Sequence, residues 1–115
     1  MAATSGRNVL AQWVDELVVI TVPEEIDVTN SVRLKETLLE AIARRPAVVV
    51  VHMTATTFCD SGGMHAIVSA YRQAAAAGAE LRLAMGPAGP RRIFELSGVD
   101  TVIDVYPDLS AALSA

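Results

Sequence analysis

A hydroxyl group between a carboxylate and two glycines is the feature of this sequence best placed to do chemistry. Ser61 follows Asp60 and precedes Gly62 and Gly63, within residues 57–64, which read TFCDSGGM. A helix is predicted to begin here, so the hydroxyl would lie near unpaired backbone N–H groups, and the glycines would leave its approach open. Serine and aspartate are also favoured as N-caps, so the spacing alone is compatible with either a reactive or a structural serine.

Five strands and four helices are predicted to position this segment. The first two strands are separated only by Asp15 and Glu16, a connection short enough for an antiparallel hairpin. Amphipathic periodicity and proline or glycine stops predict the other elements. Strands are predicted at 9–14, 17–22, 47–51, 81–85 and 102–106, and helices at 30–45, 61–78, 90–98 and 107–113.

The element order predicts an α/β fold with a mixed, mostly parallel sheet. The order is β-β-α-β-α-β-α-β-α, in which strands that alternate with helices form right-handed crossovers. The strand at 47–51 is apolar throughout, as expected for a central strand that is covered on both faces. The strand at 81–85 alternates apolar residues with Arg82 and Ala84, so we expect it nearer an edge, with one face partly exposed. Residues 23–29 and 54–60 are predicted as loops.

Length and composition indicate one domain in the cytoplasm. A chain of 115 residues with 52% hydrophobic and 19% charged residues builds a single core, predicted over residues 9–115 after an N-terminal tail of residues 1–8. The net charge of -4 and the dispersed Lys and Arg residues argue against binding to nucleic acid. No apolar run approaches the roughly 20 residues that cross a membrane. A single cysteine, Cys59, fits a reducing compartment.

Enzymatic and metal-binding interpretations find little support in the remaining residues. Cys-Asp-Ser-Gly-Gly is similar to the Gly-Asp-Ser-Gly-Gly segment of trypsin-like proteases, but that chemistry needs a histidine base and a buried acid on an all-β scaffold. The chain offers only His52 and His65, and it has no zinc-type spacing. We therefore predict that the protein is not an enzyme, has no catalytic residues and requires no metal or cofactor.

Three segments resemble the bacterial anti-sigma-factor antagonists of the STAS domain family. Residues 58–64 resemble the signature F-x-D-S-[ST]-G-[LI], with Gly62 in the place of the second hydroxyl residue. Residues 25–27 resemble G-E-[LI]-D after the second strand, with Glu24 in the place of the glycine. Residues 92–99 resemble the helix motif R-[VI]-[LF]-x-[LI]-[ST]-G-[LV]. The likeness extends over residues 9–114, in the same order.

The resemblance implies a single STAS domain that acts as a partner switch. Its unphosphorylated form would bind an anti-sigma factor with serine kinase activity and free the sigma factor. Phosphorylation at Ser61 would abolish that binding, and a serine phosphatase would reset it. An alternative is a docking subunit of a transporter ATPase or a stress-signalling assembly, without a sigma-factor role. The partner-binding residues expected around Ser61 are Glu25, Asp27, Asp60, Gly62, Gly63 and Met64.

Overall fold

A five-stranded sheet forms the centre of the fold in the computed structural model, which describes residues 8–87 and 90–115. Strand β1 is antiparallel to β2, and the other neighbouring strands are parallel. The spatial order is β1 (Leu10–Val14), β2 (Leu17–Thr21), β4 (Val48–His52), β6 (Glu80–Ala84) and β7 (Asp104–Tyr106). The predicted hairpin, the central strand and the mostly parallel sheet are confirmed. The predicted tail, apart from Asn8, lies outside the described residues.

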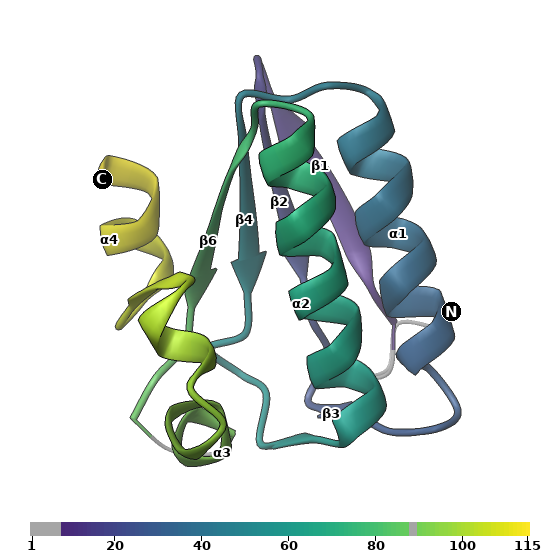
Figure 1. The fold of residues 1–115 in the computed structure, drawn as a ribbon, viewed down its shortest axis with the longest axis vertical. Helices are drawn as coiled ribbons and strands as arrows, with labels where there is room; N and C mark the ends of the chain where they lie inside the picture. Colours follow the sequence, from purple (N-terminus) through teal and green to yellow (C-terminus); the bar gives the residue numbers. More distant parts are fainter. Residues whose placement is uncertain (1–7, 88–89) are drawn as a thin grey trace.

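The four predicted helices are confirmed, and they cover the two faces of the sheet unequally (Figure 1). Helices α1 (Ser31–Ala43) and α2 (Ser61–Ala76) lie side by side over one face, where the larger hydrophobic cluster is buried. Helix α4 (Leu109–Ser114) packs on the opposite face, and α3 (Arg91–Leu96) lies beyond the lower end of β6. The last strand begins two residues later than predicted, because Val99–Thr101 form a 3-10 turn.

Strand β4 shows why an unbroken apolar run marks the centre of the sheet. Val49 and Val51 belong to the cluster beneath α1 and α2, whereas Val50 belongs to the cluster beneath α4. Successive side chains of a strand point to opposite faces, so both faces of β4 need an apolar side chain. All three valines are fully buried.

Strand β6 lies next to the edge strand β7, so its predicted position nearer an edge is confirmed, but the predicted partly exposed face is wrong. It lies between β4 and β7, and Arg82 is only 7% exposed. The Arg82 guanidinium donates hydrogen bonds to both carboxylate oxygens of Glu80, at 2.9 and 3.1 Å, and to the Ala112 carbonyl oxygen at 2.8 Å. These hydrogen bonds lower the pKa of Glu80. Alternation in the sequence indicated exposure, but a buried arginine whose three nitrogen atoms each donate a hydrogen bond produces the same pattern.

We predict that Arg82→Ala destabilises the fold by about 1–3 kcal/mol, because it leaves the Ala112 carbonyl without its buried donor. Urea-induced unfolding followed by circular dichroism measures the loss. Arg72→Ala is the matched control, since Arg72 is exposed on α2, and it should change stability by less than about 0.5 kcal/mol. Equal losses for the two variants would show that Arg82 does not anchor α4.

Candidate functional site

Ser61 is the first residue of α2, at the edge where the parallel strands end (Figure 1). The N-cap is Asp60, whose Oδ1 accepts a hydrogen bond from the Gly63 backbone N–H at 2.8 Å. The interpretation of Ser61 as the N-cap is therefore wrong. Ser61 is exposed, and no described residue forms a hydrogen bond with its hydroxyl group. The side chain is thus open to a reagent that arrives from solvent.

A second, two-stranded sheet joins the acidic loop to the Ser61 segment. Strand β3 (Glu25–Ile26) pairs in parallel with β5 (Phe58–Cys59), with Glu25 opposite Phe58 and Ile26 opposite Cys59. The Asp60 N–H continues the pairing by donating to the Ile26 carbonyl at 3.0 Å. The pairing therefore brings the acidic loop next to the Asp60–Ser61 step. Both strands lie in segments predicted as loops, because two residues are too few to show alternation.

Asn30 fixes the conformation of the acidic loop, a role that the sequence did not indicate. Its side chain is buried; Oδ1 accepts from the Asp27 N–H at 2.9 Å, and Nδ2 donates to the Glu25 carbonyl at 2.9 Å. Asp27 in turn accepts hydrogen bonds from the Thr29 N–H at 2.9 Å and the Thr29 hydroxyl at 2.6 Å. In the sequence, Asn30 is a polar residue at the start of a predicted helix, a position that suggests only an N-cap. The loop is held by side-chain hydrogen bonds at both ends.

The two glycines after Ser61 have different roles. Gly63 is buried, and a Cβ atom there would lie 2.4 Å from Ile26 Cγ2 and 2.7 Å from Cys59 Sγ. Gly63 thus permits the close contact of α2 with β3 and β5, which corrects the expectation that it leaves the approach open. Gly62 is exposed, and a Cβ atom there would make a tight contact of 3.3 Å with Ser31 Oγ, which a small shift of that side chain relieves.

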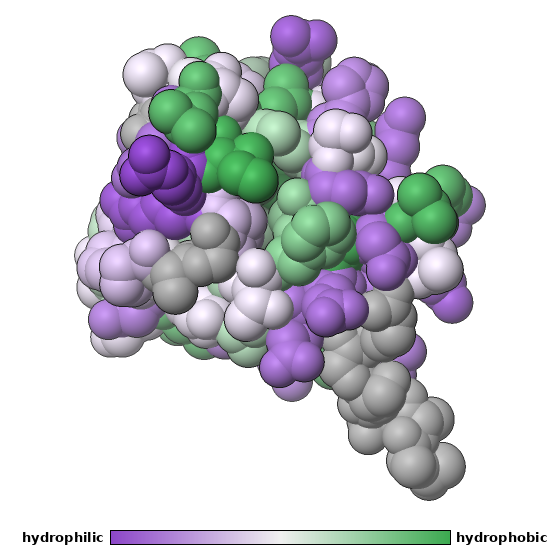
Figure 2. Space-filling model, turned by 90° about the horizontal axis from the view of Figure 1, so that it is seen from below, coloured by the Kyte–Doolittle hydropathy of each residue, from purple (hydrophilic) through white to green (hydrophobic). Residues whose placement is uncertain are grey.

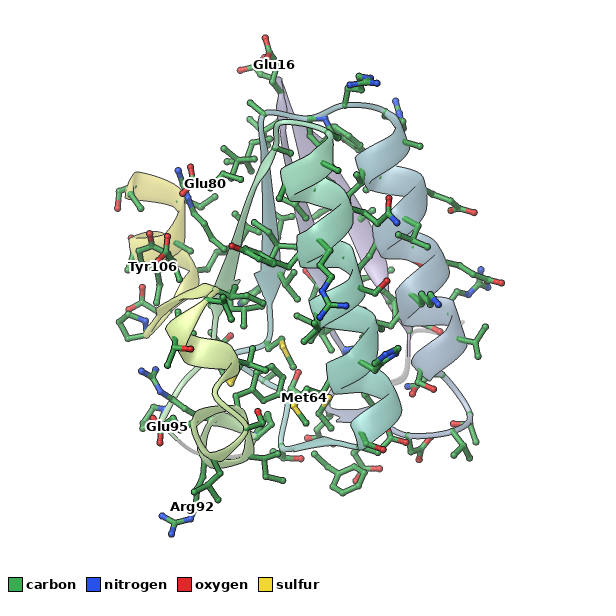
Figure 3. The ribbon with its side chains drawn as sticks, in the orientation of Figure 1. Glu16, Met64, Glu80, Arg92, Glu95 and Tyr106 are labelled. Carbon is green, nitrogen blue, oxygen red and sulfur yellow. The ribbon has the colours of Figure 1, made fainter. Side chains whose placement is uncertain are left out.

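Met64 and three exposed apolar residues belong to elements at the end of the molecule where α2 begins (Figure 1). Met64 is half-buried and points from α2 toward α3, where the Ser97 hydroxyl lies 3.3 Å from its sulfur atom (Figure 3). Phe58, Ile93 and Leu96 are 49%, 48% and 76% exposed. Figure 2 views this end of the molecule and shows apolar groups separated by hydrophilic ones. Such a mixed surface suits a protein partner better than a small molecule.

Cys59 is placed for packing and not for reaction. Its side chain is buried beneath Gly63. Burial, reinforced by the charge of Asp60, raises the pKa of the thiol to about 12. Since the thiolate is the nucleophile and the metal ligand, Cys59 remains a protonated, inert thiol at neutral pH.

The two histidines lie on different elements, His52 at the end of β4 and His65 on α2. His52 Nε2 lies 2.7 Å from the Thr54 hydroxyl, and burial lowers the pKa of His52. His65 is exposed on α2. Within residues 8–87 and 90–115, no group of three His, Cys, Asp or Glu residues is arranged to hold a metal ion. None of the helices in those ranges has the length and apolar character needed to span a membrane.

We predict that Gly63→Ala destabilises the protein by about 1–3 kcal/mol or more, because the new methyl group would overlap Ile26 and Cys59. Thermal and urea unfolding measure the effect. Gly62→Ala is the matched control: its methyl group would lie 3.3 Å from the Ser31 hydroxyl oxygen and 3.4 Å from Asp60 Oδ1, so only a small side-chain shift is needed, and alanine favours the helix. A similar loss in both variants would contradict the packing role of Gly63.

The buried thiol yields a second prediction for this site. At about pH 8, the native protein should react with Ellman's reagent more than about a hundredfold more slowly than the urea-unfolded chain, because its thiol stays protonated and covered. The absorbance of the released thionitrobenzoate measures the rate. Equal rates would show that Cys59 is accessible in the native state.

Comparisons with known proteins agree with this geometry. A crystal structure of an anti-sigma factor antagonist from Mycobacterium paratuberculosis is 24% identical, with a TM-score of 0.85, over 93% of this chain and 91% of that chain. An anti-sigma-factor antagonist (STAS) domain protein from Planctomyces limnophilus is 17% identical, with a TM-score of 0.80, over 92% and 94%.

The Bacillus cell fate determinant SpoIIAA, solved in its phosphorylated form, is 20% identical, with a TM-score of 0.72, over 93% of this chain and 97% of that chain. At these identities the likeness shows the shared fold. No curated protein sequence matches the chain. The family model for the STAS domain matches residues 8–112, nearly the whole length. The chain therefore belongs to the STAS domain family.

Proposed function

We propose that this protein is an anti-sigma-factor antagonist in the cytoplasm, controlled by phosphorylation of Ser61. The unmodified form binds an anti-sigma factor that has serine kinase activity, and this binding frees the sigma factor. Phosphorylation of Ser61 ends the binding, and a serine phosphatase restores it. The observation that carries the proposal is the exposed Ser61 hydroxyl, which Asp60 leaves free by capping α2 in its place.

The local geometry supports a switch that acts on binding and leaves the fold intact. A phosphoryl group on Ser61 adds about -1.5 to -2 charges at neutral pH. At the first position of a helix, negative charge is tolerated, since the helix dipole stabilises it by about 0.3–1 kcal/mol. The phosphorylated protein should therefore keep its structure. The added charge would instead weaken the binding of a partner that covers this surface.

Charge repulsion in an interface is large enough to release that partner. The phosphate would lie next to Asp60, on a surface where the β3–β5 pairing also holds Glu25 and Asp27. A docked protein would already lie against these carboxylates. It would then have to accommodate the phosphate dianion as well, in an interface from which water is excluded. Like-charge contacts of this kind cost several kcal/mol, and each 1.4 kcal/mol lowers affinity about tenfold.

The partner's contacts are expected from apolar groups around the hydroxyl. Phe58 precedes the acceptor on β5, and Met64 follows it on α2. Leu96 lies at the end of α3, which Ser97 connects to Met64. Large apolar side chains of this type are the usual energetic centres of protein interfaces, with charged residues at the rim. Glu25, Asp27, Asp60 and Gly62 would belong to that rim, while Gly63 supports it from below.

The structural relatives support the same proposal. Two of them are described as anti-sigma-factor antagonists, and SpoIIAA was solved in its phosphorylated form. The phosphoryl transfer itself would be carried out by the kinase and the phosphatase. This protein would contribute the acceptor and the docking surface, without a catalytic residue, metal or cofactor of its own.

We predict that Ser61→Ala retains its partner and that Ser61→Asp binds it at least about tenfold more weakly, because the aspartate introduces part of the phosphate's charge. Each variant is used as bait in cell extract from the native organism, and quantitative mass spectrometry compares the captured proteins. Ser110→Asp, which adds the same charge at an exposed position of α4, is the control and should capture the partner as well as the wild type does.

The captured protein is then incubated with ATP and wild-type chain, and the phosphorylated residue is identified by mass spectrometry. Modification confined to Ser61, and absent in Ser61→Ala, is the expected result. A partner that binds the Ala and Asp variants equally and never phosphorylates Ser61 would contradict the switch. That result would favour a docking subunit of a larger assembly.

A further inference from the structure

Strand β1 has an outer edge with which no strand in the described ranges pairs. It is the first strand in the spatial order, and its register partner is β2 alone. Soluble proteins usually protect such edges with charged residues, proline or a bulge, because the free N–H and C=O groups recruit further strands. Residues 10–14 read LAQWV and include no charged residue and no proline. The outer edge of β1 can therefore form backbone hydrogen bonds with a further strand.

The hairpin geometry identifies the free backbone groups. Asp15 and Glu16 form a two-residue turn, with Asp15 at φ 55°, so Val14 and Leu17 form the hydrogen-bonded pair that closes it. Antiparallel pairs alternate between bonded and non-bonded positions. The N–H and C=O groups of Ala11 and Trp13 therefore point away from β2, toward the open edge.

We propose that β1 is a homodimer interface, in which a second copy of β1 pairs antiparallel about a two-fold axis at Gln12. In this register Ala11 of each copy lies opposite Trp13 of the other. Both residues carry the outward N–H and C=O groups, so the two pairs complete four backbone hydrogen bonds. The two sheets become one continuous sheet of ten strands, which removes this edge from each copy.

The side chains fit this axis on both faces of the sheet. On the face that carries α1, the small Ala11 meets the large Trp13, over which the Arg44 guanidinium already stacks at 4.6 Å. On the other face, Leu10 meets Val14, and the two Gln12 amides meet on the axis. Leu10 and Val14 are 54% and 64% exposed in the single chain, so their pairing buries apolar surface.

Two-fold axes at the two residues that flank Gln12 pair unlike side chains. An axis at Ala11 would place Leu10 opposite Gln12, and an axis at Trp13 would place Val14 opposite Gln12. Each would bury an apolar side chain against an amide and would leave that amide without its partner. Among the axes at the three central residues of β1, only the one at Gln12 matches apolar with apolar and amide with amide, as a self-complementary interface requires. The pairing uses no residue of the Ser61 segment, so it is independent of the proposed function.

Analytical ultracentrifugation tests the dimer. The apparent mass of the wild type should rise toward that of two chains as its concentration increases. Gln12→Lys and Gln12→Glu each place like charges on the axis and should weaken association by more than about tenfold. An equal mixture of the two variants should dimerise again, since opposite charges then meet. Gln73→Lys, the same substitution at an exposed position of α2, should behave as the wild type.

Disulfide trapping tests the register. Gln12→Cys should form a covalent dimer rapidly under mild oxidation, because the two sulfur atoms meet on the axis. Leu10→Cys and Val14→Cys should cross-link slowly alone and rapidly when mixed. Cys59 is buried and does not interfere. A wild type that stays monomeric at every concentration, or Gln12 variants that associate as strongly as the wild type, would overturn the proposal.

Discussion

The contact of α2 with the small β3–β5 sheet is the constraint on which the candidate site depends. Gly63 lies so close to Ile26 and Cys59 that no other residue fits without displacement. That contact fixes where α2 begins, and the Asp60 side chain then caps the helix through the Gly63 N–H. Since Asp60 takes the cap, the serine that follows it is left on the surface with its hydroxyl free.

The same small sheet gives the site its electrostatic character. It joins two loops that are more than 30 residues apart in the sequence, as the Thr57 N–H bond to the Glu24 carbonyl at 2.8 Å shows. Asn30 then holds the acidic loop through one bond to Asp27 and one to Glu25. Backbone pairing and the buried Asn30 amide thus bring the acidic loop next to the exposed Ser61 hydroxyl.

The rest of the fold supports this surface through buried apolar packing and a buried hydrogen bond. The central valines of β4 are buried on both faces, and Arg82 connects α4 to β6 through the Ala112 carbonyl. The two edge strands of the five-stranded sheet, β1 and β7, differ in length and charge. Strand β7 has three residues and includes the exposed Asp104, whereas β1 has five uncharged residues, which makes β1 the better template for association.

Much of this was readable from the sequence, because its signals are local. Helical periodicity placed α1 and α2, the Asp15–Glu16 turn indicated the hairpin, and three motifs indicated the family. Whether Ser61 caps α2 or is left exposed could not be read in this way, because Ser61 and Asp60 are both good caps and only the contact of Gly63 with β3 and β5 decides between them. The burial of Arg82 and the β3–β5 pairing were missed for the same reason. Local periodicity shows which face of a helix or strand is apolar. Only the tertiary structure decides which element covers that face and which distant backbone groups form hydrogen bonds with its polar groups.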